Sequence, residues 1–137
     1  MGGIGGTLAG NALSLAAMRA TLENVLTAKA FETMIPLAKR FADGVAAEIG
    51  KKDLAWNVIR LGARAEYHFS EKPPRNGAQS AAAADFELER FLHLYALNRG
   101  VLLTPFHNMA LMCAATTAAD VDLHTQIFAE AAAELTA

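Results

Sequence analysis

The feature that most constrains this fold is a long helical stripe that gives way abruptly to short strand-like segments. Apolar residues recur at helical spacing from Phe31 to Ile49, and Gly50 ends the pattern. Two short segments rich in β-branched and aromatic residues follow, at 56–61 and 64–69, with Gly62 between them. They predict two strands. The chain therefore has to combine a long helix with a small sheet.

Further elements are predicted on both sides of this transition. Asn11, Thr27, Asp85 and Thr117 are candidate N-caps, each followed by an apolar stripe, which predicts helices at 11–26, 27–50, 85–97 and 117–135. Pro36 is expected to kink or split the second helix. Residues 71–77 are predicted as a loop, 81–84 as helical or loose, 101–104 as a buried strand and 109–112 as a short strand. This order indicates an α+β fold, a small and mostly antiparallel sheet covered by helices.

Charge and composition exclude several kinds of partner. The formal net charge of −2 gives no electrostatic basis for binding nucleic acid or an acidic membrane. The first eighteen residues carry no charge but lack a basic region, so neither a signal peptide nor a spanning helix fits. The single Cys113 cannot form an internal disulfide and is expected to be a buried structural thiol.

The opening MGGIGGTLAGN is a glycine-rich stretch that runs into a helix start. It has no Gly-Lys-Ser/Thr ending and does not complete G-x-G-x-x-G, so it is neither a P-loop nor a dinucleotide-binding turn. Two interpretations remain. Its backbone N–H groups and the Thr7 hydroxyl could meet an anion near the helix start, or the stretch is simply a flexible end.

No self-contained active site emerges from the remaining residues. The four histidines have no metal-ligand spacing. His107 follows Pro105 and Phe106 in a non-regular stretch, where a side chain can be aimed into a pocket. Arg99 precedes Gly100 and can either cap helix carbonyls or present its guanidinium to a carboxylate, with capping slightly favoured. The chain is therefore expected to contribute a few groups to a site built mostly elsewhere.

Three segments carry a family resemblance. Residues 6–17, GTLAGNALSLAA, resemble the G-T-x-x-G-N-P-L-A-x-A-A segment of class III (fold type I) pyridoxal-phosphate aminotransferases. Residues 98–105, NRGVLLTP, and 115–120, ATTAAD, resemble the C-terminal part of the same family. The resemblance covers essentially the whole chain. It is greatest for the branch that contains glutamate-1-semialdehyde aminomutase and the β-amino-acid aminotransferases.

The resemblance implies a role for several residues. Gly6 and Thr7 would contact the phosphate of pyridoxal phosphate bound by a homodimer partner, and Arg99 and His107 would bind the amino-acid substrate. His107 and Asn108 stand where the aminomutase branch has a Phe-Glu pair after a Ser, which argues against the aminomutase reaction.

The resemblance also implies a division of the chain and the absence of the catalytic groups. Residues 1–27 would be an interdomain segment and helix leading from a missing N-terminal large domain, and 28–137 the C-terminal small domain. The family's catalytic lysine, its aspartate under the pyridine nitrogen and its stacking aromatic ring match no residue here. The isolated chain is therefore expected to be inactive.

The parent protein implied by the resemblance is a homodimeric, cytoplasmic aminotransferase. It would transfer an amino group between an amino acid, with β-amino acids as one candidate class, and a keto acid. Three alternatives stay open: an aminomutase fragment, a stand-alone α+β protein-interaction module, and a small ligand-binding or regulatory domain that uses the region of Arg99 and His107.

Overall fold

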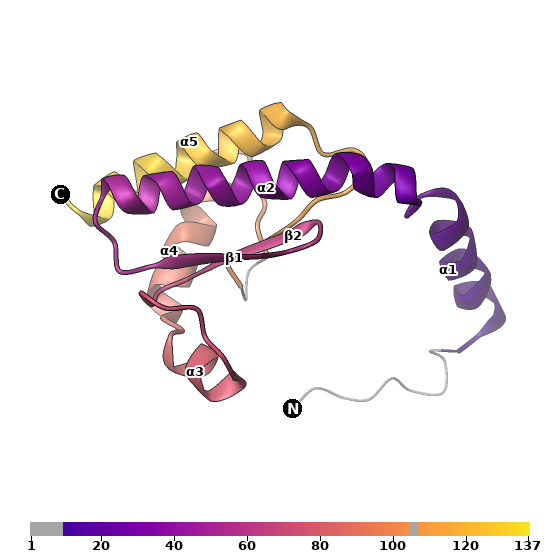
Figure 1. Cartoon of the computed structure of the whole chain (residues 1–137), viewed down its shortest axis with the longest axis horizontal. Coiled ribbons are helices and arrows are strands. Elements are labelled where there is room, and N and C mark those ends of the chain that lie inside the picture. Colours follow the sequence, from indigo (N-terminus) through magenta and orange to yellow (C-terminus); the bar gives the residue numbers. More distant parts are fainter. Residues whose placement is uncertain (1–9, 105–106) are drawn as a thin grey trace.

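The computed structural model describes residues 10–104 and 107–137. Eight elements follow one another along the chain, and Figure 1 shows their arrangement. They are α1 (Ala12–Asn24), α2 (Ala28–Lys51), β1 (Asn57–Leu61), β2 (Arg64–His68), α3 (Gly77–Ala82), α4 (Phe86–Leu97), β3 (Met109–Leu111) and α5 (Ala118–Leu135). The α+β fold class is confirmed, with a small antiparallel sheet and helices packed against it.

The sheet has three antiparallel strands in the order β1-β2-β3. A two-residue turn joins β1 to β2, since Leu61 pairs directly with Arg64. Gly62 opens this turn at φ +57°, where a residue with a Cβ is strained and a hairpin turn of the II′ kind places glycine. The two strands predicted on either side of Gly62 are confirmed, and they form a hairpin.

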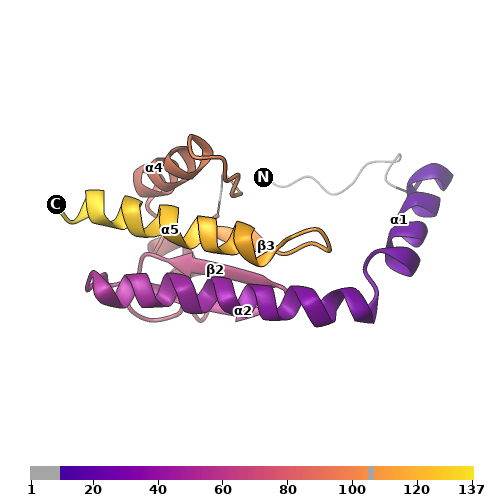
Figure 2. The same cartoon turned by 90° about the horizontal axis from the view of Figure 1, so that it is seen from above.

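Helices α2 and α5 lie side by side and cover one face of the sheet (Figures 1 and 2). Large buried side chains fill the core between these helices and β2, among them Phe41 and Val45 of α2, Tyr67 of β2 and Phe128 of α5. The rings of Tyr67 and Phe128 meet edge-on with centroids 5.1 Å apart, a preferred geometry for aromatic pairs. This packing fixes β2 beneath the two helices.

The four predicted N-caps are confirmed at the starts of α1, α2, α4 and α5. Each capping side chain accepts a hydrogen bond from a backbone N–H of the first turn. At α5, Thr117 and Asp120 form a reciprocal capping box, in which the Asp120 carboxylate also accepts from the Thr117 N–H at 2.8 Å. A short polar side chain satisfies otherwise unpaired donors at a helix start, which is why these positions could be found by their chemistry.

A split of the second helix at Pro36 and a strand at 101–104 are not observed. Helix α2 runs through Pro36 without a break. The proline removes only one backbone hydrogen bond, and burial of the rest of the stripe against the sheet and α5 maintains the helix. Residues 101–104 form no strand, because the Val101 N–H instead donates to Ala96 O at 3.0 Å and closes the end of α4. Leu103 still reaches the core.

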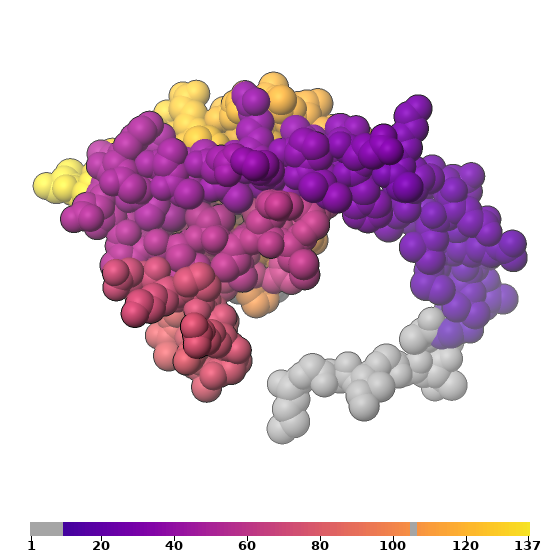
Figure 3. Space-filling model, in the orientation of Figure 1, coloured from indigo at the N-terminus to yellow at the C-terminus, as the bar shows by residue number. Residues whose placement is uncertain are grey.

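Helix α1 stands off the body formed by the other elements (Figure 3). None of its residues is buried, and its apolar side chains face outward, with Leu13 80% exposed and Met18 and Leu22 each 55% exposed. The apolar stripe predicted for this helix therefore meets no other part of the described chain. Within the parts of the chain that the structure describes, no helix has both the length and the apolar character needed to cross a bilayer.

Candidate functional site

The predicted phosphate-binding residues, Gly6 and Thr7, lie outside the described residues. The structure describes the helix start that follows them. Asn11 caps α1, and its side-chain oxygen accepts from the Ser14 N–H at 2.9 Å. The role of Gly6 and Thr7 stays a prediction.

Arg99 lies just beyond the C-terminal end of α4. Its guanidinium stands over the Tyr95 ring, 3.5 Å from the centroid, and its Nη1 donates to the Tyr95 carbonyl at 3.2 Å. Its Nε lies 3.5 Å from Glu130 Oε2 on α5. Capping of the helix by Arg99 is thus confirmed. A substrate carboxylate would have to compete with Glu130 for this guanidinium, and substrate binding by Arg99 stays a prediction.

His107 lies near a buried carboxylate. Its Nδ1 is 3.7 Å from Oε1 of Glu66, and the His107 side chain is 61% exposed. Glu66 belongs to β2, is only 8% exposed, and its Oε2 accepts from Nη2 of Arg64 at 2.5 Å. Arg64, Glu66 and His107 form the charged cluster of the described chain that most resembles a functional site.

A pocket of about 330 Å³ opens beside this cluster, between β2 and α3. His107, Asn108, Glu66 and His68 line it on the side of the sheet, and small residues of α3 and the following turn line the other side. Arg99 is not among the residues that line this pocket. The two predicted substrate-binding residues therefore occupy separate surroundings within the described chain.

Sequence reasoning missed Glu66. It singled out His107 from its loop but treated the acidic residues as solvated. The available signal was the alternation of Arg64, Glu66 and His68 along β2, which places three polar side chains on one face of a strand. Polar residues at a period of two predict the face of the strand turned away from the core, but they do not predict that Glu66 is buried there.

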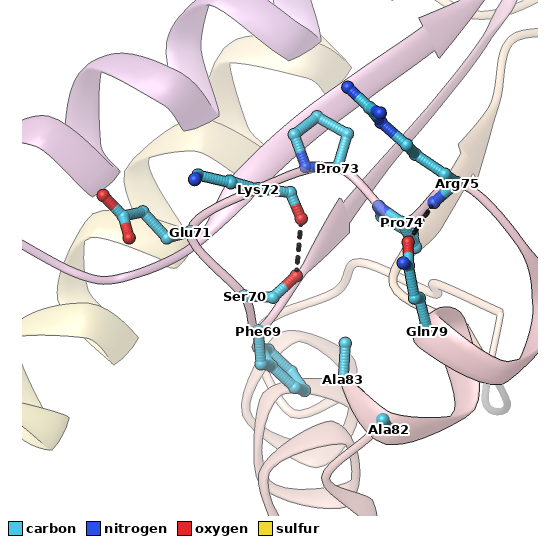
Figure 4. A pocket seen from close by; sticks show the side chains of 10 residues that line it. All are labelled: Phe69, Ser70, Glu71, Lys72, Pro73, Pro74, Arg75, Gln79, Ala82 and Ala83. Atoms are coloured by element: carbon cyan, nitrogen blue, oxygen red, sulfur yellow. Dashed lines mark hydrogen bonds between the residues drawn. The ribbon is translucent and has the colours of Figure 1, made fainter.

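A wider hollow of about 1000 Å³ lies next to α3 in the loop after β2. Figure 4 shows the residues that line it and the hydrogen bonds between them. The Ser70 hydroxyl donates to the Lys72 carbonyl at 3.0 Å, and the Arg75 N–H donates to Gln79 Oε1 at 2.8 Å. These bonds connect neighbouring parts of the segment that follows β2.

The prediction that Cys113 is a buried thiol was wrong, because the residue is exposed. The chain turns away from the sheet after β3, and the Cys113 N–H donates to the Thr116 hydroxyl at 3.0 Å. Hydrogen bonds from the Thr116 hydroxyl and the Ala115 backbone hold the pKa of the thiol below its ordinary value. Among the described residues, no group of three His, Cys, Asp or Glu side chains is placed to hold a metal ion.

The pocket beside His107 does not by itself fit pyridoxal phosphate. The pocket at His107 is lined by two carboxylates, Glu66 and Glu89, which would repel a phosphate group. No lysine lines that pocket, although a lysine amine is what holds this cofactor covalently. A cofactor site at this pocket would therefore need groups beyond those that line it.

Solved structures identify the class to which the fold belongs. A glutamate-1-semialdehyde aminomutase from Pseudomonas aeruginosa PAO1, solved in complex with PMP, superposes with a TM-score of 0.89 at 53% identity, over 97% of this chain and 29% of that one. A β-phenylalanine aminotransferase from Variovorax paradoxus shares the fold, with a TM-score of 0.76 at 21% identity over 95% of this chain and 30% of that one. The chain belongs to the class III, fold type I family of pyridoxal-phosphate-dependent aminotransferases.

Curated relatives indicate the particular members of that family. The chain is 33% identical over 132 residues to glutamate-1-semialdehyde 2,1-aminomutase from Anaeromyxobacter sp. (strain Fw109-5), covering 93% of this chain and 30% of that protein. It is 31% identical over 100 residues to glutamate-1-semialdehyde 2,1-aminomutase 2 from Brevibacillus brevis, covering 73% of this chain and 23% of that protein. No family model matches the chain. The chain thus spans about three tenths or less of the length of these relatives.

Proposed function

We propose that this chain forms part of a pyridoxal-phosphate-dependent enzyme that transfers an amino group between an amino acid and a keto acid. The observation that carries the pyridoxal-phosphate chemistry is the TM-score of 0.89 at 53% identity, over 97% of the chain, to the Pseudomonas aeruginosa aminomutase. The cofactor supplies the electron sink that makes amino transfer possible. Since the chain spans only a fraction of its relatives, the activity belongs to a longer protein.

The proposal assigns the chain's own residues to binding. Gly6 and Thr7 would donate hydrogen bonds to the phosphate across a homodimer interface, and Arg99 and His107 would bind the substrate. Residues 1–27 would join a large catalytic domain to the small domain at 28–137. The exposed apolar side chains of α1 support this division, because a helix with that surface needs a covering partner. The cytoplasm is the location that the family resemblance predicts.

A second candidate is the aminomutase reaction, in which the amino group moves within one substrate. It is favoured by the identity to the Pseudomonas aeruginosa aminomutase and to the curated aminomutases. His107 and Asn108, which replace the Phe-Glu pair that the resemblance implies for that branch, favour amino transfer between two substrates. These two reactions differ in whether a keto-acid acceptor is required.

The experiment uses the full-length enzyme that contains this chain, loaded with pyridoxal phosphate. It is incubated with α- or β-amino acids and a keto-acid acceptor, and separately with glutamate-1-semialdehyde alone. Amino transfer that requires the keto acid supports the first candidate, and conversion of glutamate-1-semialdehyde without an acceptor supports the second. Absence of both activities in a cofactor-loaded protein would refute both.

The 137-residue chain gives a second test. It has five lysines, none at the pocket beside His107, and we expect it to form no stable adduct with pyridoxal phosphate. The measurement is intact mass after incubation with the cofactor and borohydride reduction. A defined, stoichiometric adduct on one lysine would contradict the expected inactivity of the isolated chain.

A further inference from the structure

The polar face of β2 places a carboxylate among apolar neighbours. Glu66 pairs in register with Ile59 on β1 and with Met109 on β3, and side chains at paired positions share a face of the sheet. These neighbours help to explain why Glu66 is only 8% exposed although it does not face α2 and α5. A carboxylate this buried needs charged or hydrogen-bonding partners.

The two oxygens of Glu66 face two different partners. Oε2 accepts from Arg64 Nη2 at 2.5 Å, and Oε1 lies 3.7 Å from Nδ1 of His107. Arg64 therefore holds one oxygen of the carboxylate, and the other oxygen faces the histidine. Arg64 and Glu66 belong to a strand that is paired on both sides, whereas His107 belongs to a loop.

This geometry favours one tautomer of His107. Nδ1 lies 3.7 Å from Glu66 Oε1, too far for a hydrogen bond, but the negative carboxylate attracts a proton placed on the nitrogen that faces it. In the neutral imidazole, Nε2 is then left without a proton and accepts a hydrogen bond. Since the imidazole lines the pocket beside α3, Nε2 is the ring atom available to a molecule there.

The other charged groups at the pocket point to a cationic or donor group on that molecule. Glu89 from α4 also lines the pocket, as does His68 from β2. Nε2 of His68 is buried and has no hydrogen-bond partner in the described structure. The carboxylates of Glu66 and Glu89 are acceptors, so the pocket is suited to an ammonium or hydroxyl group rather than to a carboxylate.

We propose that Glu66, held by Arg64, is a positioning residue that fixes the tautomer of His107, so that its Nε2 accepts a hydrogen bond from an ammonium or hydroxyl group of the substrate. This inference rests on the proposed function, since it takes the ligand of the pocket to be the amino-acid substrate. It adds two residues, Arg64 and Glu66, to those that the family resemblance indicates.

The first readout is the tautomer of His107 in the full-length enzyme. Imidazole ¹⁵N chemical shifts of histidine-labelled protein distinguish the Nδ1–H from the Nε2–H form, and the His107 signals are assigned by their loss in His107→Gln. The wild type is expected to hold the Nδ1–H form. In Glu66→Gln, Arg64 retains the amide oxygen and turns the NH₂ group toward His107, so the tautomer is expected to invert.

The second readout is kinetic. Glu66→Gln is expected to raise KM for the amino donor roughly tenfold with little change in kcat, and to add no further effect in a His107→Gln background, because coupled residues give non-additive effects. Glu66→Asp, which keeps the charge, is expected to recover part of the loss. Glu134→Gln, which removes an exposed carboxylate near the end of α5, is the matched control and is expected to behave as the wild type.

Two outcomes would overturn the inference: an unchanged His107 tautomer in Glu66→Gln, or kinetic effects of Glu66→Gln and His107→Gln that multiply independently. Retained cofactor absorbance and an unchanged unfolding temperature in Glu66→Gln exclude a general loss of structure. If the wild type binds no cofactor and transfers no amino group, the proposed function fails. The tautomer measurement then still decides whether Glu66 positions His107.

Discussion

Protonation of His124 should destabilise the fold at mildly acidic pH. His124 belongs to α5, is 4% exposed, and packs its ring on Phe41 with centroids 4.3 Å apart. Its Nδ1 is buried and has no hydrogen-bond partner in the described structure. Burial lowers the pKa of His124 from 6.5 to about 4, because a charged imidazolium loses its hydration there.

The sign and size of the effect follow from proton binding in the two states. Between pH 6.5 and about 4, the unfolded chain binds a proton at His124 that the folded chain excludes, so stability falls as the pH falls. Above pH 6.5, the titration of His124 takes almost nothing from the free energy of unfolding. The complete loss is about 3 kcal/mol, and about 2 kcal/mol of it is expected at pH 5 relative to pH 8.

The assay is urea unfolding of the 137-residue chain at pH 8 and pH 5, followed by the fluorescence of Trp56. This is the single tryptophan of the chain, and it packs against Phe69 and Phe128, so its emission reports on the core. The comparison is with His124→Phe, which keeps an aromatic ring and removes the titrating group. Steric costs of the phenyl ring apply equally at both pH values.

The wild type is expected to lose about 2 kcal/mol more than His124→Phe between pH 8 and pH 5. The other three histidines are present in both chains, so their contributions cancel in the comparison. The carboxylates of Asp120 and Asp122, whose pKa values are lowered by hydrogen bonds from Thr117 and Arg40, destabilise only as the pH falls below about 3.8. Equal losses in the two proteins would refute the reasoning about His124.

Three further predictions concern packing, capping and the cofactor. Gly44→Ala should destabilise the chain by about 1–3 kcal/mol, because a Cβ at Gly44 would lie 2.7 Å from Thr125 Oγ1. In a Thr125→Ala background the same change should stabilise by up to about 1 kcal/mol through helix propensity, and urea unfolding that shows the same sign in both backgrounds would contradict the clash. Thr117→Ala should cost about 1 kcal/mol in the same assay by removing the cap of α5, whereas an unchanged midpoint would mean that Asp120 alone suffices. Thr7→Ala in the full-length enzyme should weaken retention of pyridoxal phosphate, measured by dialysis and cofactor absorbance, and undiminished affinity would remove Thr7 from the phosphate site.

Local chemistry explains why much of the fold was predictable from the sequence. The helix starts follow from short polar side chains placed before apolar stripes, as at Thr27 and Thr117. The β1–β2 hairpin follows from a glycine between two strand-like segments, and Gly62 does adopt a positive φ. In each case the signal and the structure lie within a few residues of each other. Such features need no knowledge of the tertiary fold.

The errors arose where particular hydrogen bonds and the direction of the chain, rather than residue spacing, decide the structure. Residues 101–104 have the composition of a strand, but the Val101 N–H closes the end of α4, so the segment enters the core without pairing. The importance of Glu66 depends on Arg64 and on His107, which lies 41 positions further along the chain. The exposure of Cys113 depends on how the chain leaves β3. Patterns of spacing carry little information about such encounters.

The exposed helix α1 has a consequence for how the fold is completed. It has thirteen residues, and none of them is buried. A peptide helix of this length is marginal in water without tertiary contacts, so the helicity of α1 depends on whatever surface covers Leu13, Met18 and Leu22. The exchange of the α1 amide protons with solvent therefore reports whether this surface is covered. Their exchange with solvent should slow by orders of magnitude when the chain joins its covering surface, while those of α2 and α5 change little.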